Sequence, residues 1–187
     1  MLAAKIVTCG KYFSMKKYWY IIPLVLVLII LALVLIYSSG SSDKFGKNHP
    51  IPQGLEYSLP LNDSISAPAV DTLDSSTWLV LRNDIQGGIY NYDFYYTPLP
   101  AGEIFLRCFE ATENIPLSEK EIEERSKVQI DSTASFSQLV NKQQFSIYEG
   151  DWEDYYAARV EVWFRDAATK QEKKLLEKVY RVEGWTR

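Results

Sequence analysis

The sequence has little of what catalysis and metal binding usually require. Its 187 residues include one histidine and two cysteines. They contain no glycine-rich phosphate loop, no Gly-x-Ser-x-Gly elbow and no Cys-x-x-Cys pair. His49 falls in a stretch without a hydrophobic pattern, so no Ser-His or Cys-His pair is expected within a fold. These absences predict a protein that is not an enzyme, binds no nucleotide and needs no cofactor or metal.

The two cysteines are not expected to form a disulfide. Cys9 precedes and Cys108 follows a long apolar run, so a membrane would separate them. Cys108 lies within a strand-like apolar stretch, residues 104–109, which predicts a buried thiol acting as a small hydrophobic side chain. The alternative is a reactive or intermolecular thiol.

Acidic residues are absent from the first part of the chain. Lys5, Lys11, Lys16 and Lys17 precede the apolar run, and all 24 acidic residues follow it, the first being Asp43. The remainder therefore carries more acidic than basic residues. This balance argues against a nucleic-acid partner, because phosphate binding needs a basic surface.

The apolar run, residues 18–37, contains no charged residue. Twenty helical residues span about 30 Å, the thickness of a bilayer hydrocarbon core. Tyr18, Trp19 and Tyr37 would lie at the two membrane interfaces, where aromatic side chains are common. The preceding lysines place the N-terminus, residues 1–17, in the cytoplasm by the positive-inside rule. We therefore expect a single-pass anchor in a bacterial cytoplasmic membrane, with the rest of the chain periplasmic or extracellular.

Two alternatives for the N-terminus stay open. The run could be a secretory signal cleaved near residues 38–40, although such apolar regions are usually about 7 to 15 residues long. Met15, followed by two lysines, resembles a bacterial translation start, so residues 1–14 could be an extension. Both starts leave lysines before the apolar run.

Serine and proline dominate residues 38–76, which contain few large apolar side chains. Such a stretch buries too little apolar surface to offset its ordering entropy. The sequence predicts a flexible linker here, and a folded outer domain over residues 77–187.

Aromatic and β-branched residues recur along residues 77–187 at the spacing of an all-β domain. Tyr90, Tyr92, Phe94 and Tyr96 alternate with polar residues, as in a strand with one buried face. The expected strands are residues 78–82, 89–96, 103–112, 128–131, 143–149, 156–165 and 172–183, the first three forming a meander.

Seven short strands in about 110 residues favour an antiparallel, immunoglobulin-like β-sandwich. The turn at residues 99–102, with Ile104 and Leu106 after it, resembles the local pattern of many bacterial immunoglobulin-like and transthyretin-like surface modules. This resemblance implies the same mainly β architecture.

Helix signals occur at two places in the outer domain. Ser118 and Glu121 fit a capping box that would open a short connecting helix on the surface, ending near Lys127. Residues 170–178 are good helix formers, yet the β-like residues 179–182 follow directly, so a strand is favoured there.

The most unusual segment is residues 148–156, where four carboxylates lie among four aromatic rings. Trp152 and Tyr155 could stack on sugar rings while Asp151 and Asp154 accept hydrogen bonds from hydroxyl groups. The same acids could serve a calcium site or the paired carboxylates of a glycosidase. The simplest interpretation is a turn with solvated acids and partly buried rings.

Tyr95 is a further candidate, since it could be exposed on its strand and bind a partner protein. The simpler interpretation is that this ring packs within the domain. Taken together, the sequence predicts a membrane-tethered, non-catalytic binding or scaffolding module of the cell envelope, whose partner is an envelope protein or a glycan. The alternative is a polysaccharide-acting enzyme or glycan-binding domain that uses the segment from Asp151 to Asp154.

Overall fold

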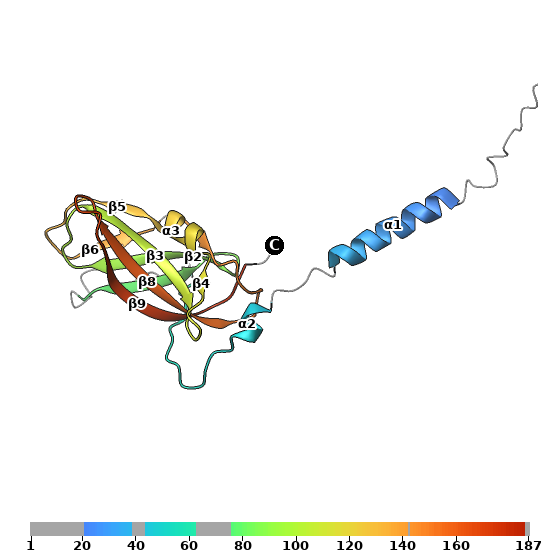
Figure 1. The fold of residues 1–187 in the computed structure, drawn as a ribbon, viewed down its shortest axis with the longest axis horizontal. Coiled ribbons are helices and arrows are strands. Elements are labelled where there is room, and N and C mark those ends of the chain that lie inside the picture. Colours follow the sequence, from blue (N-terminus) through green and yellow to red (C-terminus); the bar gives the residue numbers. More distant parts are fainter. Residues whose placement is uncertain (1–20, 39–43, 63–75, 142, 186–187) are drawn as a thin grey trace, which may run out of the picture. The chain divides into compact units, whose positions relative to one another are not determined.

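A computed structural model describes residues 21–38, 44–62, 76–141 and 143–185 of the chain. It contains two compact units, residues 1–41 and residues 42–187. The first contains helix α1 (Ile21–Ser38) and the second contains all the strands (Figure 1).

Helix α1 covers most of the predicted anchor and is 18 residues long. Aliphatic side chains from Leu24 to Leu31 are exposed along it. In the parts of the chain that the structure describes, no helix meets both the length and the apolar character that a membrane span requires. The predicted N-terminal segment, residues 1–17, and the first three residues of the predicted anchor lie outside the described residues.

Strands dominate the second unit, and they form two antiparallel sheets. One sheet has the order β1-β2-β6, with β7 also paired to β2; the other has the order β4-β3-β8-β9, with β5 also paired to β3. The strands are β1 (Trp78–Asn83), β2 (Ile89–Tyr96), β3 (Gly102–Glu110), β4 (Pro116–Leu117), β5 (Val128–Ile130), β6 (Ser137–Val140), β7 (Phe145–Ser146), β8 (Tyr156–Asp166) and β9 (Glu172–Val182).

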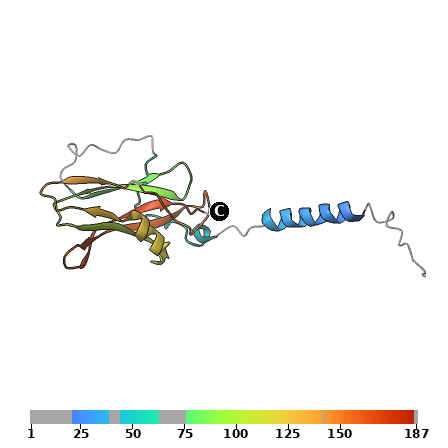
Figure 2. The same ribbon diagram turned by 90° about the horizontal axis from the view of Figure 1, so that it is seen from above.

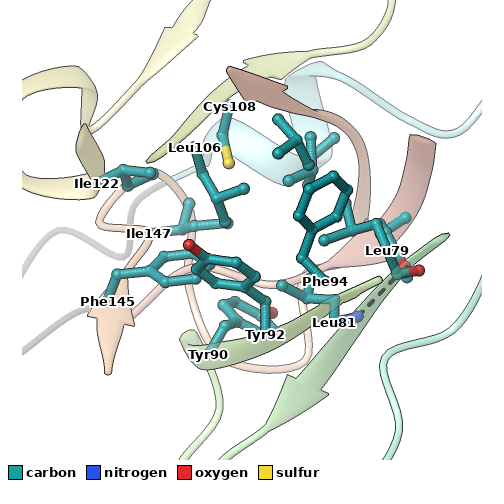
Figure 3. Close-up of a cluster of buried hydrophobic side chains, with 14 of the residues drawn as sticks. Leu79, Leu81, Tyr90, Tyr92, Phe94, Leu106, Cys108, Ile122, Phe145 and Ile147 are labelled. Carbon is teal, nitrogen blue, oxygen red and sulfur yellow. Dashed lines mark hydrogen bonds between the residues drawn. The ribbon is translucent and has the colours of Figure 1, made fainter. Parts of the chain in front are cut away.

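The two sheets lie as two layers and share one hydrophobic core (Figure 2). Tyr90, Tyr92, Phe94 and Tyr96 of β2 all point into it, so the predicted alternation is confirmed. Figure 3 shows the rings of β2 together with Leu106 and Cys108 from β3. The predicted mainly β architecture with antiparallel pairing is therefore confirmed, in the form of two sheets.

Cys108 is a buried free thiol, as predicted. Burial raises the pKa of this thiol far above its usual value, because the surrounding core cannot solvate a thiolate. A reactive role for Cys108 is thereby disfavoured.

Two details of the strand prediction are wrong. The described residues contain nine strands, because residues 137–140 form β6 and residues 116–117 form β4. The first three strands are no meander, since β3 pairs with β8 in the other sheet. Pro98 and Pro100 lie between β2 and β3, where the tight turn of a hairpin would be needed, and the chain crosses over instead. Residues 172–182 form a strand, which settles the helix alternative.

The helix after β4, α3 (Glu119–Ser126), is present but differs in its start and its packing. Ser118 has a left-handed backbone, φ 39°, and its side chain makes no capping bond to the helix. Its hydroxyl instead donates to Glu149 Oε2 at 2.7 Å. Ile122 and Ser126 are fully buried, so the predicted surface helix in fact packs one face on the core.

Residues 44–62, part of the stretch expected to be a flexible linker, belong to the second unit. Ser58 N–H donates to Val179 O at 2.9 Å, and Leu61 N–H donates to Leu81 O at 2.8 Å. These bonds bridge the edge of β9 in one sheet and the edge of β1 in the other. Backbone pairing of this kind needs no apolar side chains, so composition could not reveal it.

Candidate functional site

An open groove of about 340 Å³ lies at one end of the second unit, where three loop regions meet. The β1–β2 turn, the β7–β8 loop and the residue after β9 form its walls. We call it the Trp152 groove, defined by Ile85, Gln86, Gly87, Trp152, Glu153, Tyr155 and Glu183.

Backbone hydrogen bonds hold these three regions together. Ile147 N–H donates to Gly88 O at 3.0 Å, and Trp185 N–H donates to Ile147 O at 2.7 Å. Gly88 has φ +76°, and an added Cβ would lie 2.4 Å from the Trp185 nitrogen. A glycine is required there because the turn and the C-terminal segment approach too closely for a side chain.

The buried hydroxyl of Tyr90 fixes the backbone of Glu183. It donates to Glu183 O at 3.1 Å and accepts from Glu183 N–H at 3.0 Å. Burial raises the pKa of Tyr90, so the phenol stays neutral and can both donate and accept. The backbone of Glu183, a residue that lines the groove, is thereby held in place.

Glu153 occupies a strained position at the tip of the β7–β8 loop. Its φ is +62°, a left-handed conformation that side chains with a Cβ rarely adopt. Glu153 N–H donates to Glu183 Oε2 at 2.6 Å, which stabilises that conformation. The Glu153 side chain is exposed in the groove.

Three large apolar side chains project around these carboxylates. Ile85 is 94% exposed, Trp152 is 54% exposed and Tyr155 is 41% exposed. The guanidinium of Arg181 lies 4.4 Å from the centre of the Tyr155 ring, a cation–π contact that orients the ring.

The structure brings together only part of the predicted site. Trp152 and Tyr155 line one groove, as the sugar-stacking hypothesis requires, whereas Asp151 and Asp154 are not among its lining residues. Asp151 Oδ1 accepts from Trp152 N–H at 3.1 Å, and Asp154 Oδ2 accepts from Lys47 N–H at 3.1 Å. The acids of the groove are Glu153 and Glu183.

Sequence reasoning missed both glutamates as candidates, for different reasons. Glu153 lies within the acidic and aromatic segment, residues 148–156, so the sequence alone could have indicated it as a candidate. Glu183 follows β9, and its place beside the β7–β8 loop depends on contacts between distant parts of the chain.

The side chain of Tyr95 is fully buried, so of its two predicted roles the structure supports packing over partner binding. β6 pairs with β2 and places Gln138 opposite Tyr95. Gln138 Nε2 donates to the Tyr95 hydroxyl at 2.9 Å, and the Phe136 ring stacks on it with centres 6.3 Å apart. Side chains from the unrecognised strand β6 and from the residue before it thus pack against Tyr95.

A second depression, of about 270 Å³, lies where residues 56–58 cross β9. Lys178 borders it, with its amine 5.9 Å from the centre of the Trp78 ring and 5.1 Å from that of Tyr180. Burial lowers the pKa of Lys178. Its Nζ donates to Leu79 O at 3.4 Å, so this lysine has a structural role between strands.

In the described ranges of the chain, no group of three or more His, Cys, Asp or Glu side chains could hold a metal ion. His49 is mostly buried, with Nδ1 2.8 Å from Phe45 O and Nε2 3.6 Å from Glu113 Oε2, and it does not line the groove.

Comparison of this chain with protein-family models, with curated proteins and with solved structures finds no match.

Proposed function

We propose that this protein is a membrane-tethered, non-catalytic binding module of the bacterial cell envelope. The charge-free run of residues 18–37 follows four lysines, and α1 forms a helix over most of it. In this proposal the helix anchors the chain in the cytoplasmic membrane, with the N-terminus inside and the strand-rich unit periplasmic or extracellular.

We also propose that the outer domain is an immunoglobulin-like β-sandwich. Taking β1, β2 and β6/β7 as strands A, B and E, and β3, β8 and β9 as C, F and G, gives the partition typical of that fold. Tyr156 begins β8, and its hydroxyl donates to Glu149 O at 2.7 Å. This bond resembles the tyrosine corner found between strands E and F of immunoglobulin-like domains.

One observation carries the binding role: Trp152, Tyr155 and Ile85 are exposed around a single groove. Exposed aromatic rings are costly to keep in water, and their gathering around a concave surface is typical of a binding site. The hydrogen bonds that fix the groove walls give such a site its rigidity.

The alternative enzyme hypothesis receives no support from the positions of Asp151 and Asp154. Both carboxylates accept backbone N–H bonds, which uses them to shape the loop. A glycosidase needs two carboxylates that face each other across the substrate.

A retention experiment with the full chain in lipid nanodiscs tests the binding role. The nanodiscs are incubated with isolated bacterial envelopes, and the envelope material that they retain is measured. Trp152→Ala with Tyr155→Ala should lower retention at least about tenfold, the effect of losing about 1.4 kcal/mol of binding free energy.

Trp78→Ala with Tyr57→Ala is the matched control, since these rings are 42% and 44% exposed and line no part of the groove. Retention by this control variant should equal that of the unmodified chain. Equal losses in both double variants, or no loss in either, would overturn the proposed binding role.

A further inference from the structure

The aromatic and polar side chains of the Trp152 groove together indicate a class of ligand. This inference rests on the proposed binding role. We propose that the Trp152 groove binds a neutral glycan chain, with Trp152 and Tyr155 as the surfaces on which sugar rings stack. Glu153, Glu183 and Gln86 are then the partners of the sugar hydroxyl groups.

The two aromatic rings suit the apolar faces of sugars. A pyranose ring presents axial C–H groups that carry partial positive charge, and an aromatic face carries the negative part of its quadrupole. Trp152 and Tyr155 keep about half of their surface exposed on the same groove, so adjacent sugar rings can contact both. The groove volume of about 340 Å³ falls within the range of small-ligand sites.

The polar side chains of the groove distinguish a glycan from a protein partner. Glu153 and Glu183 lie among the apolar side chains, and the centres of protein interfaces are depleted in acidic residues. Covering these carboxylates with an apolar protein surface would desolvate two charges, for which the single N–H bond from Glu153 to Glu183 Oε2 compensates only in part, and this is costly. Sugar hydroxyl groups can donate to both carboxylates, and Gln86 adds an amide that donates and accepts.

The charge of the groove selects against anionic glycans. Both charged lining residues, Glu153 and Glu183, are acidic, and Asp151 lies two residues before Glu153 in the same loop. Arg181 is stacked on Tyr155 and does not line the groove. A uronate or phosphate on the ligand would therefore be repelled, so the preferred chain is neutral.

The backbone at Glu153 is left-handed, a conformation that glycine adopts at the least steric cost. Strain of this kind occurs at functional sites, but Lys170 adopts the same conformation in a hairpin outside the groove. The assignment of Glu153 to the ligand therefore rests on its place in the groove.

Titration of the full chain in nanodiscs with defined tetrasaccharides tests this proposal. The neutral probes are chitotetraose, cellotetraose and maltotetraose, and tetragalacturonate is the anionic probe of equal length. Calorimetry should show saturable binding of at least one neutral probe and no binding of tetragalacturonate. Trp152→Ala and Tyr155→Ala should each weaken that binding at least about tenfold.

Trp78→Ala and Tyr57→Ala are the controls and should leave the affinity unchanged within about twofold. Circular dichroism and the melting temperature show whether each variant is folded. A chain that binds no neutral probe, or binds tetragalacturonate as tightly, overturns the glycan proposal. If the envelope retention assay still depends on Trp152 in that case, the binding role stands and only the glycan assignment fails.

Discussion

The backbone N–H of Lys47 donates to Asp154 Oδ2 at 3.1 Å, across 107 residues of sequence. This bond places the short helix α2 (Phe45–Asn48) against the loop that carries Trp152 and Tyr155. The Phe45 ring adds a contact to Tyr156, with ring centres 5.1 Å apart. The segment that leads out of the N-terminal part therefore supports the groove loop directly.

Gly46→Val should separate α2 from this loop. A Cβ at Gly46 would lie 2.4 Å from Asp154 O, so the helix or the loop must shift. We expect the free energy of unfolding to fall by about 1 to 3 kcal/mol, the usual effect of overpacking, measured by urea denaturation. Lys47→Ala keeps the backbone donor and is the control. Equal stability of Gly46→Val and the unmodified chain would show that α2 is not held there.

Glu153→Gly should stabilise the fold and weaken ligand binding. The steric cost of a side chain at φ +62° is removed, which should raise the free energy of unfolding by about 1 to 2 kcal/mol. The groove at the same time loses a carboxylate. Lys170, at φ +59° in the β8–β9 hairpin, is the matched control. Lys170→Gly should raise the free energy of unfolding in the same way and leave ligand affinity unchanged. A Glu153→Gly variant that binds as well as the unmodified chain would remove the role assigned to this side chain.

Tyr180→Phe should loosen the join between the two sheets. The Tyr180 hydroxyl, on β9, donates to Leu79 O at 2.7 Å and accepts from Leu81 N–H at 3.2 Å, both on β1. Its removal leaves the buried Leu81 N–H unpaired and leaves Leu79 O with only the long bond from Lys178 Nζ, which should lower the free energy of unfolding by about 1 to 3 kcal/mol. Thermal unfolding measures this change, with the exposed Tyr57→Phe as control. A loss equal to that of Tyr57→Phe would contradict the bridging role.

The stability of the outer domain should fall in alkali. Burial raises the pKa of Tyr90, Tyr92 and Tyr180, so the folded chain binds more protons than the unfolded chain above the ordinary tyrosine pKa near 10. Their contribution is complete below that pH and is lost as the pH rises above it, at about 1.4 kcal/mol per pH unit for each tyrosine.

Urea denaturation at a series of alkaline pH values measures this slope, and Tyr92→Phe should reduce it by the share of one tyrosine. A free energy of unfolding that stays constant to pH values well above 10 would contradict the assignment.

Several strands could be predicted because their own residues encode them. The alternation from Tyr90 to Tyr96 indicates a strand with one buried face, and the residues paired across β8 and β9 are β-branched or aromatic at many positions. Strand β6 was missed because Ser137 and Gln138 are polar, and their place is set by pairing to β2. The ordered segment near Ser58 was missed for a related reason, since only its backbone pairs with the sheets.

Only some residues of the candidate site could likewise be predicted from the sequence. Trp152 and Tyr155 could be singled out from the unusual composition around them, and the structure places both on one groove. The roles of Asp151 and Asp154 could not be predicted, because they depend on which backbone N–H each carboxylate meets. Glu183 enters the groove only through the fold, which brings the end of β9 beside the β7–β8 loop.

The proposed membrane tether requires the apolar run of residues 18–37 to hold the strand-rich unit outside the cytoplasmic membrane. Epitope tags at both ends of the full chain, probed by antibodies on intact bacterial spheroplasts, test this directly. We predict labelling of the C-terminal tag alone on intact spheroplasts, labelling of the N-terminal tag after permeabilisation, and one membrane-bound chain that carries both tags. A released chain that begins near Ser41, or a C-terminal tag that is labelled only after permeabilisation, would contradict it.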